Sequence, residues 1–400
     1  MKPSSTMKTG TLFSICAAIF VALACSKSGT AQEAPTIKVG IVYSFTGTGA
    51  PTDKQFDAAV DAWVKQHGDS VAGRKIVLIR RDDGGANPDV AKRLAQELIV
   101  QDNVEFLGGL LFTPNAIAAA QVSTAAKVPV LITEASTAGI MADNPYATRY
   151  SFTNGQLTKP LVDWALKHNV KTASIVYQNF GPGVDAADTF ERYFVAGGGK
   201  LLERVAVPFT ARDFSAYVQR IRDTKPDALY VFMVGDSGPA FIRAAYQGGI
   251  QQSGITILAN GDMVSDERLP GIGDDALGVI SSNMYYQNYP SRLNTAFVKL
   301  FRAAWGANSE PPGQAAVAAY DMMHAIYNAV QAQPGTLSLD RTMAVLRSTK
   351  FESPRGPIAI DPQTRDIVQN VYILRIERHG GEIGNREIGM YPSVRDPDEH

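Results

Sequence analysis

The sequence predicts an α/β protein built from two similar lobes, each a doubly wound parallel sheet. The first observation is a regular alternation of short apolar segments with longer helical segments, each pair having the length of a βαβ unit. The second is that this alternation stops at a loop-rich passage, residues 141–154, and then begins again. The third is length, because a mature chain of roughly 370 residues exceeds the usual size of one hydrophobic core.

The first series of elements lies between residues 37 and 133. Its strands are nearly continuous apolar runs, which is typical of a parallel sheet covered on both faces. In chain order we expect strand 37–44, helix 53–67, strand 75–80, helix 88–101, strand 104–109, a turn over residues 110–115 that leads into a helix, and strand 128–133.

The second series repeats this architecture after the loop-rich passage. We expect helix 157–168, strand 172–177, helix 184–196, strand 200–208, helix 214–223, strand 228–233, helix 237–247 and strand 256–260. An extended segment, 279–286, then crosses back. The chain ends with helices 293–305, 314–331 and 341–347 and with strands 356–360 and 367–377.

The N-terminus has the pattern of a secretory signal. Lys2 and Lys8 precede an uncharged run, residues 11–25, which is followed by a small and polar segment. Cleavage after Ala31 would remove residues 1–31 as a signal peptide. The apolar run is too short to span a bilayer as a stable helix. We therefore expect a protein exported to the periplasm.

Both cysteines, Cys16 and Cys25, lie within this leader, so the mature chain has no disulfide, thiolate metal site or cysteine nucleophile. A second interpretation is a lipid anchor on Cys25, because residues 22–25 resemble an imperfect lipobox. Initiation at Met7 is an alternative start that gives a more compact signal.

The charge balance of the mature chain argues against nucleic acid as a partner. Loss of Lys2, Lys8 and Lys27 reduces 38 basic residues to 35, against 39 acidic residues, for a net charge of −4. Phosphate binding needs a concentrated basic face, which this balance does not favour.

Motifs for catalysis or cofactor binding are incomplete. A glycine pattern after the first strand resembles a dinucleotide fingerprint, but Thr52 stands where its third glycine belongs. The histidines show no metal-ligand spacing, so no zinc site is predicted. We expect no enzyme activity, no cofactor and no metal.

Two strand ends predict a half-site for a small carboxylate. The strand that ends at Gly109 and the strand that ends at Thr133 each lead into a small polar turn. Ligands of open parallel sheets bind beyond such ends, where helix N-termini present free N–H groups. The hydroxyls of Thr113, Ser136 and Thr137 add donors and acceptors. The alternative is that these residues serve only as helix caps.

The order of elements and several local motifs resemble the periplasmic solute-binding proteins of branched-chain amino acid ABC transporters, the leucine/isoleucine/valine-binding protein family. The resemblance covers nearly all of the mature chain. It rests on Ile37-Lys38-Val39-Gly40-Ile41 with Thr46-Gly47, Arg81-Asp82-Asp83, Gly108-Gly109, Val128-Pro129-Val130, Ala135-Ser136-Thr137, Tyr177 with Phe180-Gly181-Pro182-Gly183, and Ala319-Tyr320-Asp321.

The resemblance implies a type I periplasmic-binding fold, in which three chain segments form a hinge between the lobes and the lobes close on the ligand. We expect an N-terminal lobe of residues 32–153 and 286–352. The C-terminal lobe would hold residues 154–285 and 353–392, leaving 393–400 as a tail.

For the first lobe, the resemblance implies that Ala135, Ser136 and Thr137 form the turn that binds the ligand carboxylate. Phe112 falls near a position where amino-acid binders often carry a serine. Either Thr113 replaces that hydroxyl, or Phe112 holds the apolar body of the ligand.

For the second lobe, the resemblance implies that Phe180 supplies an aromatic wall and that Asp262 pairs with a ligand ammonium. Asp236 is a neighbouring candidate. With Phe112 and Phe180, Phe45 could build a flat apolar slot. The alternatives are that the aromatic residues belong to the core and that Asp262 caps a helix.

These observations predict an extracytoplasmic protein that delivers a small carboxylate-bearing ligand to an ABC importer. The expected ligand is an amino acid of branched-chain or related type. The alternatives are an aromatic or other non-amine carboxylate, and a sensory ligand-binding subunit. The expected partners are the ligand and the permease subunits of the transporter, and the protein is expected to be a monomer.

Overall fold

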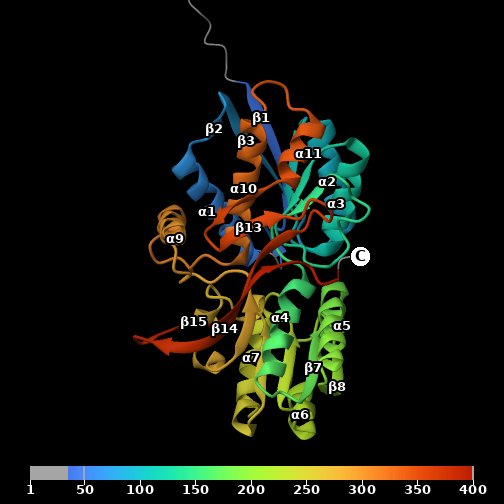
Figure 1. Ribbon diagram of the computed structural model, residues 1–400, viewed down its shortest axis with the longest axis vertical. Helices are drawn as coiled ribbons and strands as arrows, with labels where there is room; N and C mark the ends of the chain where they lie inside the picture. Colours follow the sequence, from blue (N-terminus) through green and yellow to red (C-terminus); the bar gives the residue numbers. More distant parts are fainter. Residues whose placement is uncertain (1–34, 48–49, 399–400) are drawn as a thin grey trace, which may run out of the picture. The chain divides into compact units, whose positions relative to one another are not determined.

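The computed structural model describes residues 35–47 and 50–398, so the predicted signal peptide, residues 1–31, lies outside the described residues. Within the described part, the chain forms two sheets flanked by helices (Figure 1). The two predicted α/β lobes are therefore present.

The first sheet has the strand order β2-β3-β1-β4-β5-β6, and all neighbours are parallel except β2 and β3. Its strands are β1 (Thr36–Tyr43), β2 (Ser70–Val71), β3 (Arg74–Asp82), β4 (Phe106–Gly109), β5 (Val130–Ile132) and β6 (Ala147–Arg149).

Helices cover both faces of the first sheet. On one face, a large apolar core joins β1 to α1 (Ala50–His67), α9 (Arg292–Trp305), α10 (Gln314–Gln331) and α11 (Leu339–Arg347). On the other, a second core joins the strands to α2 (Pro88–Val100) and α3 (Thr113–Ala126). Burial on both faces explains why the strands read as apolar runs.

The second sheet has the order β12-β13-β14-β11-β10-β9-β7-β8, and β15 pairs with β14. Strands β7 to β11 are parallel where they pair with one another, whereas β12 to β15 add antiparallel pairs at one edge. The bounds are β7 (Thr172–Gln178), β8 (Lys200–Val207), β9 (Ala228–Phe232), β10 (Thr256–Asn260), β11 (Ile280–Asn283), β12 (Lys350–Ser353), β13 (Gly356–Ile360), β14 (Ile367–His379) and β15 (Glu382–Val394).

Helices also cover both faces of the second sheet. The core on one face includes α4 (Asn154–Lys167) and α5 (Gly181–Ala196). The core on the other face includes α6 (Ser215–Thr224), α7 (Ser237–Gln247) and α8 (Leu269–Ile272). Short 3₁₀ turns occupy Gln251–Ser253, Gly261–Val264 and Gly273–Ala276.

Strand β14 runs from one core into the next. Val371 packs in the core of the first sheet, whereas Ile373 and Ile376 pack in the two cores of the second. Ile358 and Ile360 of β13 also pack against the first core, although β13 is hydrogen-bonded to the second sheet. The C-terminal strands thus connect the two lobes. The exact residue bounds of the lobes stay a prediction.

The predicted elements of both series are present with shifts of a few residues at their ends, but four strands were missed, one of which is the two-residue strand β2. β6 and β12 are short and lie in passages without alternating apolar residues. β15 contains Gly, Pro and charged residues, and we had expected a tail over part of it. It forms because Gly380 and Gly381 make a tight turn, both with positive φ, that folds it back on β14.

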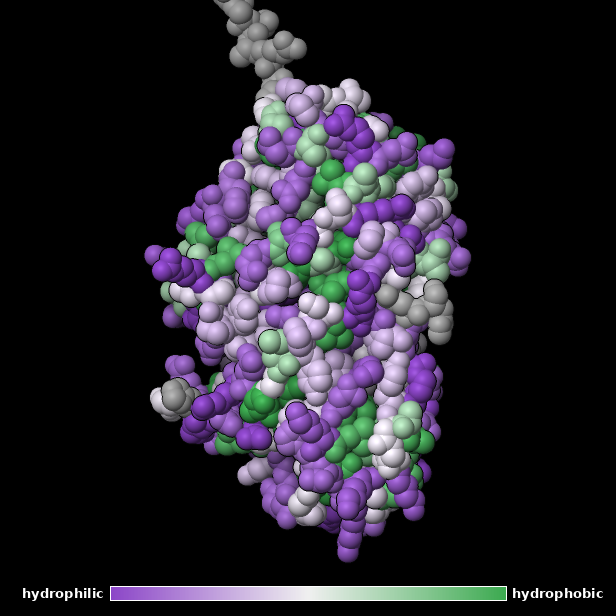
Figure 2. Space-filling model, viewed as in Figure 1, coloured by the Kyte–Doolittle hydropathy of each residue, from purple (hydrophilic) through white to green (hydrophobic). Residues whose placement is uncertain are grey.

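Hydrophilic residues cover most of the face shown in Figure 2, with hydrophobic residues interspersed. The large exposed hydrophobic residues lie on separate elements: Val100, Ile117, Val195, Tyr246 and Met390. Among the described residues, every helix is too short or too polar to cross a bilayer.

Candidate ligand-binding cleft

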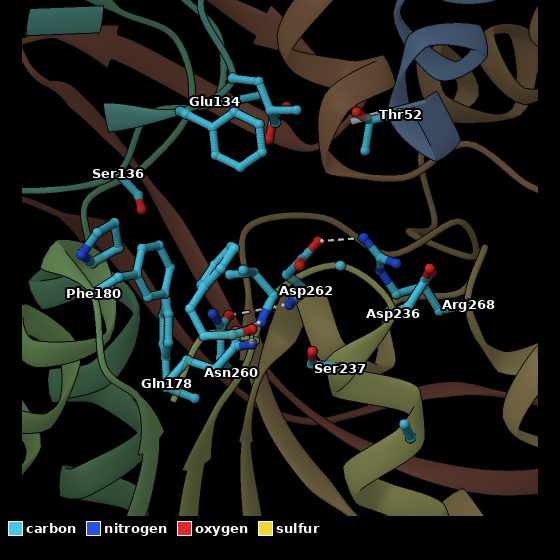
Figure 3. Close-up of a pocket in the computed structure, with 18 of the residues that line it drawn as sticks. Thr52, Glu134, Ser136, Gln178, Phe180, Asp236, Ser237, Asn260, Asp262 and Arg268 are labelled. Atoms are coloured by element: carbon cyan, nitrogen blue, oxygen red, sulfur yellow. Dashed lines mark hydrogen bonds and ion pairs between the residues drawn. The ribbon is translucent and has the colours of Figure 1, made fainter. Parts of the chain in front are cut away.

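A cavity of about 410 Å³, here called the aromatic cavity, lies where the carboxyl ends of strands from both sheets meet. Its walls come from loops after β4 and β5 of the first sheet and after β7, β8, β9 and β10 of the second. This is the position at which open parallel sheets bind ligands. Figure 3 shows the side chains that line it.

Phenylalanine side chains form much of its wall. They reach the cavity from separate elements of both lobes: Phe112, Phe152, Phe180, Phe209, Phe214 and Phe232. The rings of Phe180 and Phe209 lie 5.1 Å apart at 60°, and those of Phe180 and Phe232 lie 6.3 Å apart. Such tilted rings offer an apolar wall to a flat ligand.

Gln178 fixes two of the loops that carry these rings. Its side-chain amide donates to the carbonyl of Phe209 at 3.3 Å and accepts from the backbone N–H of Val234 at 2.9 Å. Gln178 itself is buried at the end of β7. One buried side chain thereby holds the segments after β8 and β9 against each other.

Three helices begin at the aromatic cavity: α3 after Phe112, α5 after Phe180 and α7 after Asp236. Among the described residues, none of these three N-cap residues makes a side-chain capping hydrogen bond. The first N–H groups of a helix need partners and carry a partial positive charge. The hydroxyl of Ser136 lies in the same lining. This arrangement suits an anionic group.

The turn after β4 is held in an unusual backbone conformation. Leu110 has a φ of +71°, although it is not glycine, and its neighbour Gly109 has a φ of +97°. The N–H of Leu110 donates to Val42 at 2.8 Å, and its carbonyl accepts from Ala135 at 3.1 Å. Strained residues of this kind concentrate at binding sites. Through its bond to Ala135, Leu110 also connects the turn after β4 to the turn after β5.

The acid predicted to meet an ammonium is already paired. Arg268 lies 3.3 Å from Asp262, and their side chains are 11% and 26% exposed. The N–H of Asp262 also donates to the side chain of Asn260 at 3.1 Å. Asp262 therefore faces the cavity as part of an ion pair (Figure 3).

Two further carboxyl groups, Glu134 and Glu267, lie close to this pair. Burial raises the pKa of Glu134 well above its usual value, and the charges of Asp262 and Glu267 raise it further. Burial likewise raises the pKa of Glu267 to about 7. Both groups therefore bind a proton more readily than a carboxyl group in water does.

A family model described as periplasmic binding protein matches residues 36–382. The chain belongs to the periplasmic binding protein family. Leu/Ile/Val-binding protein homolog 6 of Brucella abortus (strain 2308) is 35% identical over 376 residues, which cover 93% of this chain and 96% of the relative.

Two solved structures are similar to this periplasmic binding protein over most of its length. A solute-binding protein of an ABC transporter from Rhodopseudomonas palustris BisB5, in complex with 3,4-dihydroxybenzoic acid, is 42% identical with a TM-score of 0.86, covering 90% of this chain and 99% of that chain. A solute-binding protein from R. palustris in complex with 4-hydroxybenzoate is 36% identical with a TM-score of 0.86, covering 90% and 98%. Our chain is thus an extracytoplasmic solute-binding protein of the ABC transporter type with the type I fold.

The structure brings most of the predicted ligand residues of the periplasmic binding protein into one cavity. Those that line it are Phe112, Thr113, Ser136, Phe180, Asp236 and Asp262. The hydroxyl of Thr113 also lies 3.1 Å from that of Thr137. Direct contact of these residues with a ligand stays a prediction.

Three predicted residues lie outside the lining. Phe45 packs against the core of the first sheet, with its ring 5.7 Å from that of Tyr43. Ala135 is buried, and its N–H and carbonyl bond to Leu110 and Arg149. The carbonyl of Thr137 also accepts from Arg149, at 2.9 Å. Of the predicted aromatic slot, Phe112 and Phe180 therefore line the cavity and Phe45 does not, while Ala135 and Thr137 support the turn.

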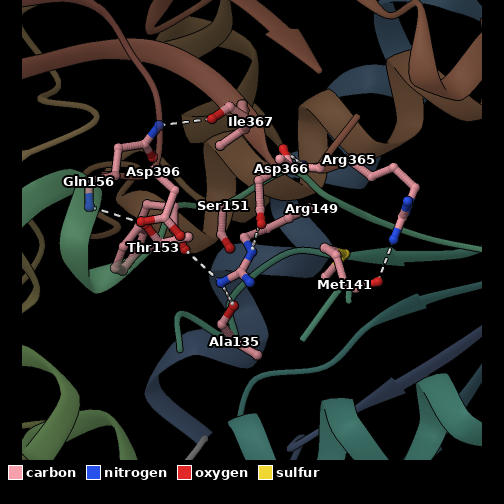
Figure 4. A network of polar contacts seen from close by, with 12 residues as sticks. Ala135, Met141, Arg149, Ser151, Thr153, Gln156, Arg365, Asp366, Ile367 and Asp396 are labelled. Atoms are coloured by element: carbon pink, nitrogen blue, oxygen red, sulfur yellow. Dashed lines mark hydrogen bonds and ion pairs between the residues drawn. The ribbon is translucent and has the colours of Figure 1, made fainter. Parts of the chain in front are cut away.

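The side chain of Arg149 holds the turn of residues 135–137 in place (Figure 4). It is fully buried, lies 2.6 Å from Asp366, and donates to the carbonyls of Ala135, Phe152 and Thr137 at 2.9 to 3.1 Å. The guanidinium thus joins the ligand turn to a segment that leads into the second lobe.

The residues that sequence reasoning missed are mainly charged or aromatic groups of loops and strand ends: Glu134, Phe152, Phe209, Phe232 and Arg268. Glu134 directly follows an apolar strand, so its position at a strand end was an available signal. The phenylalanines carried no local signal, because their convergence depends on strand order.

Proposed function

We propose that this binding protein captures an aromatic carboxylate in the periplasm and delivers it to the permease of an ABC importer. The observation that carries this proposal is the aromatic cavity, where several phenylalanine rings lie beside three helix N-termini that have no side-chain cap. A flat ring suits the first feature and a carboxylate suits the second.

The known ligands of similar proteins support this proposal. The structures at 42% and 36% identity are complexes with 3,4-dihydroxybenzoic acid and 4-hydroxybenzoate. The pairing of Asp262 with Arg268 agrees with them, because the acid is partly neutralised by the protein itself.

A branched-chain amino acid is the second candidate. The name of the Brucella abortus relative favours it. So does the group of acids near the cavity, since an ammonium could bind there.

In this proposal the protein acts by binding alone, as a monomer, and catalyses no reaction. Its export would depend on removal of residues 1–31 as a signal peptide. Ligand binding would favour closure of the lobes, which the permease recognises.

A ligand screen tests the proposal. Purified mature protein is mixed with benzoate, 4-hydroxybenzoate, 3,4-dihydroxybenzoate or leucine, and the melting temperature is measured, followed by calorimetry. At least one aromatic acid should raise the melting temperature in a concentration-dependent way. A rise with leucine and none with the aromatic acids would overturn the proposal in favour of the second candidate.

A further inference from the structure

The aromatic cavity continues into a second cavity of about 370 Å³, here called the polar cavity. Residues shared by the two linings define their junction, among them Thr52, Glu134, Asp262, Arg268 and Gln314. The polar cavity lacks the phenylalanine wall among its described lining residues. A ligand that reaches the junction therefore has an apolar body and a polar end.

Buried polar atoms at this junction and in the adjoining part of the polar cavity lack partners. Among the described residues, Oε1 of Glu134, Oε2 of Glu267 and Nε of Arg268 are buried without a hydrogen bond. Such groups cost free energy in an empty site, and a ligand that bonds to them recovers it. Figure 3 shows Glu134 across the cavity from Asp262, so a group bound between them has polar neighbours on both sides.

The acids around the polar cavity make it a poor site for a second carboxylate. Carboxyl groups outnumber guanidinium groups in its lining: Glu134, Asp236, Asp262, Glu267 and Glu310 against Arg243 and Arg268. A ligand carboxylate is repelled from this end and belongs near Ser136 and the helix N-termini. A hydroxyl fits the junction, because it can donate to a carboxyl oxygen and accept from a guanidinium.

We propose that the junction is a subsite for a hydroxyl group on the ring of the ligand, and that Glu134 is the residue that recognises this hydroxyl by a hydrogen bond. This inference rests on the proposed function and narrows its ligand class to hydroxylated aromatic acids. In this arrangement the carboxylate binds near Ser136, which lines the aromatic cavity alone, and a hydroxyl para to it, at the opposite end of the ring, binds at the junction. Plain benzoate leaves the buried Oε1 of Glu134 without a partner, so it binds more weakly.

Calorimetry with benzoate and 4-hydroxybenzoate tests the subsite. The parent protein should bind 4-hydroxybenzoate at least about tenfold more tightly, since a site built for a hydroxyl discriminates against an analogue that lacks it. Glu134→Ala should reduce this preference to about twofold or less, mainly by weakening 4-hydroxybenzoate. Glu134→Gln keeps the shape and an acceptor, so it should keep part of the preference.

A matched control is Glu310→Gln. Glu310 lines the polar cavity but is exposed and away from the junction, so its loss should leave the preference unchanged. Equal weakening of both aromatic acids by Glu134→Ala would overturn the subsite while leaving the proposed function intact. If leucine binds and Glu134→Ala abolishes that binding, the acids hold an ammonium and both proposals fall. Failure of every aromatic acid to bind the parent overturns the proposed function itself.

Discussion

At the scale of single residues, the chemistry of the cleft depends on how its acids are paired. Asp262 has a protein partner in Arg268, whereas Glu134 and Glu267 each have one buried oxygen without a hydrogen-bond partner. A paired acid repels an anionic ligand less than a free one, and a protonated acid does not repel it at all. A cleft with the same acidic residues can therefore bind an anionic or a cationic ligand. Which of the two it binds depends on whether the acids are paired with basic residues or protonated.

Substitution of Asp262 tests this pairing. Asp262→Asn removes a negative charge from the lining and frees Arg268, so an aromatic carboxylate should bind equally well or up to about tenfold more tightly. An amino-acid ligand would instead lose at least about tenfold, because its ammonium would lose a partner. Calorimetry with 4-hydroxybenzoate and leucine distinguishes the two. A large loss for 4-hydroxybenzoate would contradict the role assigned here.

Glu267 predicts a pH dependence of stability. Its pKa is about 7 in the folded protein because of burial, against an ordinary value of 4.5. The folded state thus holds the proton more tightly than the unfolded state, so stability falls as pH rises from the ordinary value through about 7. Glu267→Gln should raise the free energy of unfolding by about 1 to 3 kcal/mol at pH values above this range and have little effect below it. Chemical unfolding at several pH values measures this, and equal effects at all of them would contradict it.

At the scale of elements, the cleft depends on how helix N-termini approach the strand ends. Gly183 in the first turn of α5 is packed so tightly that a Cβ there would lie 2.0 Å from the carbonyl oxygen of Gln178. Gly181, two residues earlier, has open space at the same position. The two glycines therefore allow a matched comparison on one helix.

Gly183→Ala should push the start of α5 away from β7, because the contact is with backbone that cannot rotate aside. We expect a stability loss of about 2 to 4 kcal/mol and at least about tenfold weaker ligand binding. Gly181→Ala should change both by little. Thermal unfolding and calorimetry of the two variants provide the measurement, and similar behaviour of both would contradict the packing argument.

The sequence predicted those elements whose signals are local. Apolar runs and their flanking turns located β4 and β5, and so the turn that carries Ser136. The partner of Asp262 could not be predicted, because Arg268 meets it only after a 3₁₀ turn and a bend. The same holds for Phe152, Phe209 and Phe232, since they converge only when the order of strands in both sheets is known. Arg149 gave no signal either, because its partners are backbone carbonyls and Asp366, which is distant in the sequence.

At the scale of the whole molecule, two buried arginines join the segments that connect the lobes. Arg149 contacts Asp366 and the ligand turn, and Arg355 contacts the segment before α4 through the carbonyls of Tyr150 and Ser151. Because β14 also packs in the cores of both sheets, the connecting segments are ordered parts of the core. Lobe motion in this protein should therefore be a rotation about fixed segments and not an unfolding of linkers.

The ion pair of Arg355 and Asp321 predicts how much the segments that connect the lobes contribute to the stability of the protein. Both side chains are fully buried, and the guanidinium lies 2.7 Å from the carboxylate. Even with this partner, burial raises the pKa of Asp321 to about 6, so the carboxylate depends on Arg355 for its charge. Arg355→Met leaves that acid unpaired and removes the bonds to Tyr150 and Ser151, and should cost about 3 to 5 kcal/mol of unfolding free energy.

Adding Asp321→Asn to Arg355→Met should recover part of this loss, because a neutral amide is less costly to bury than an unpaired carboxylate. The loss in the single variant should also be smaller at a pH below about 6, where Asp321 takes up a proton. Chemical unfolding of the parent, the single and the double variant at two pH values measures both effects. If the double variant is no more stable than the single one at high pH, the loss comes from the backbone contacts of Arg355, and the ion pair is not what holds the segments together.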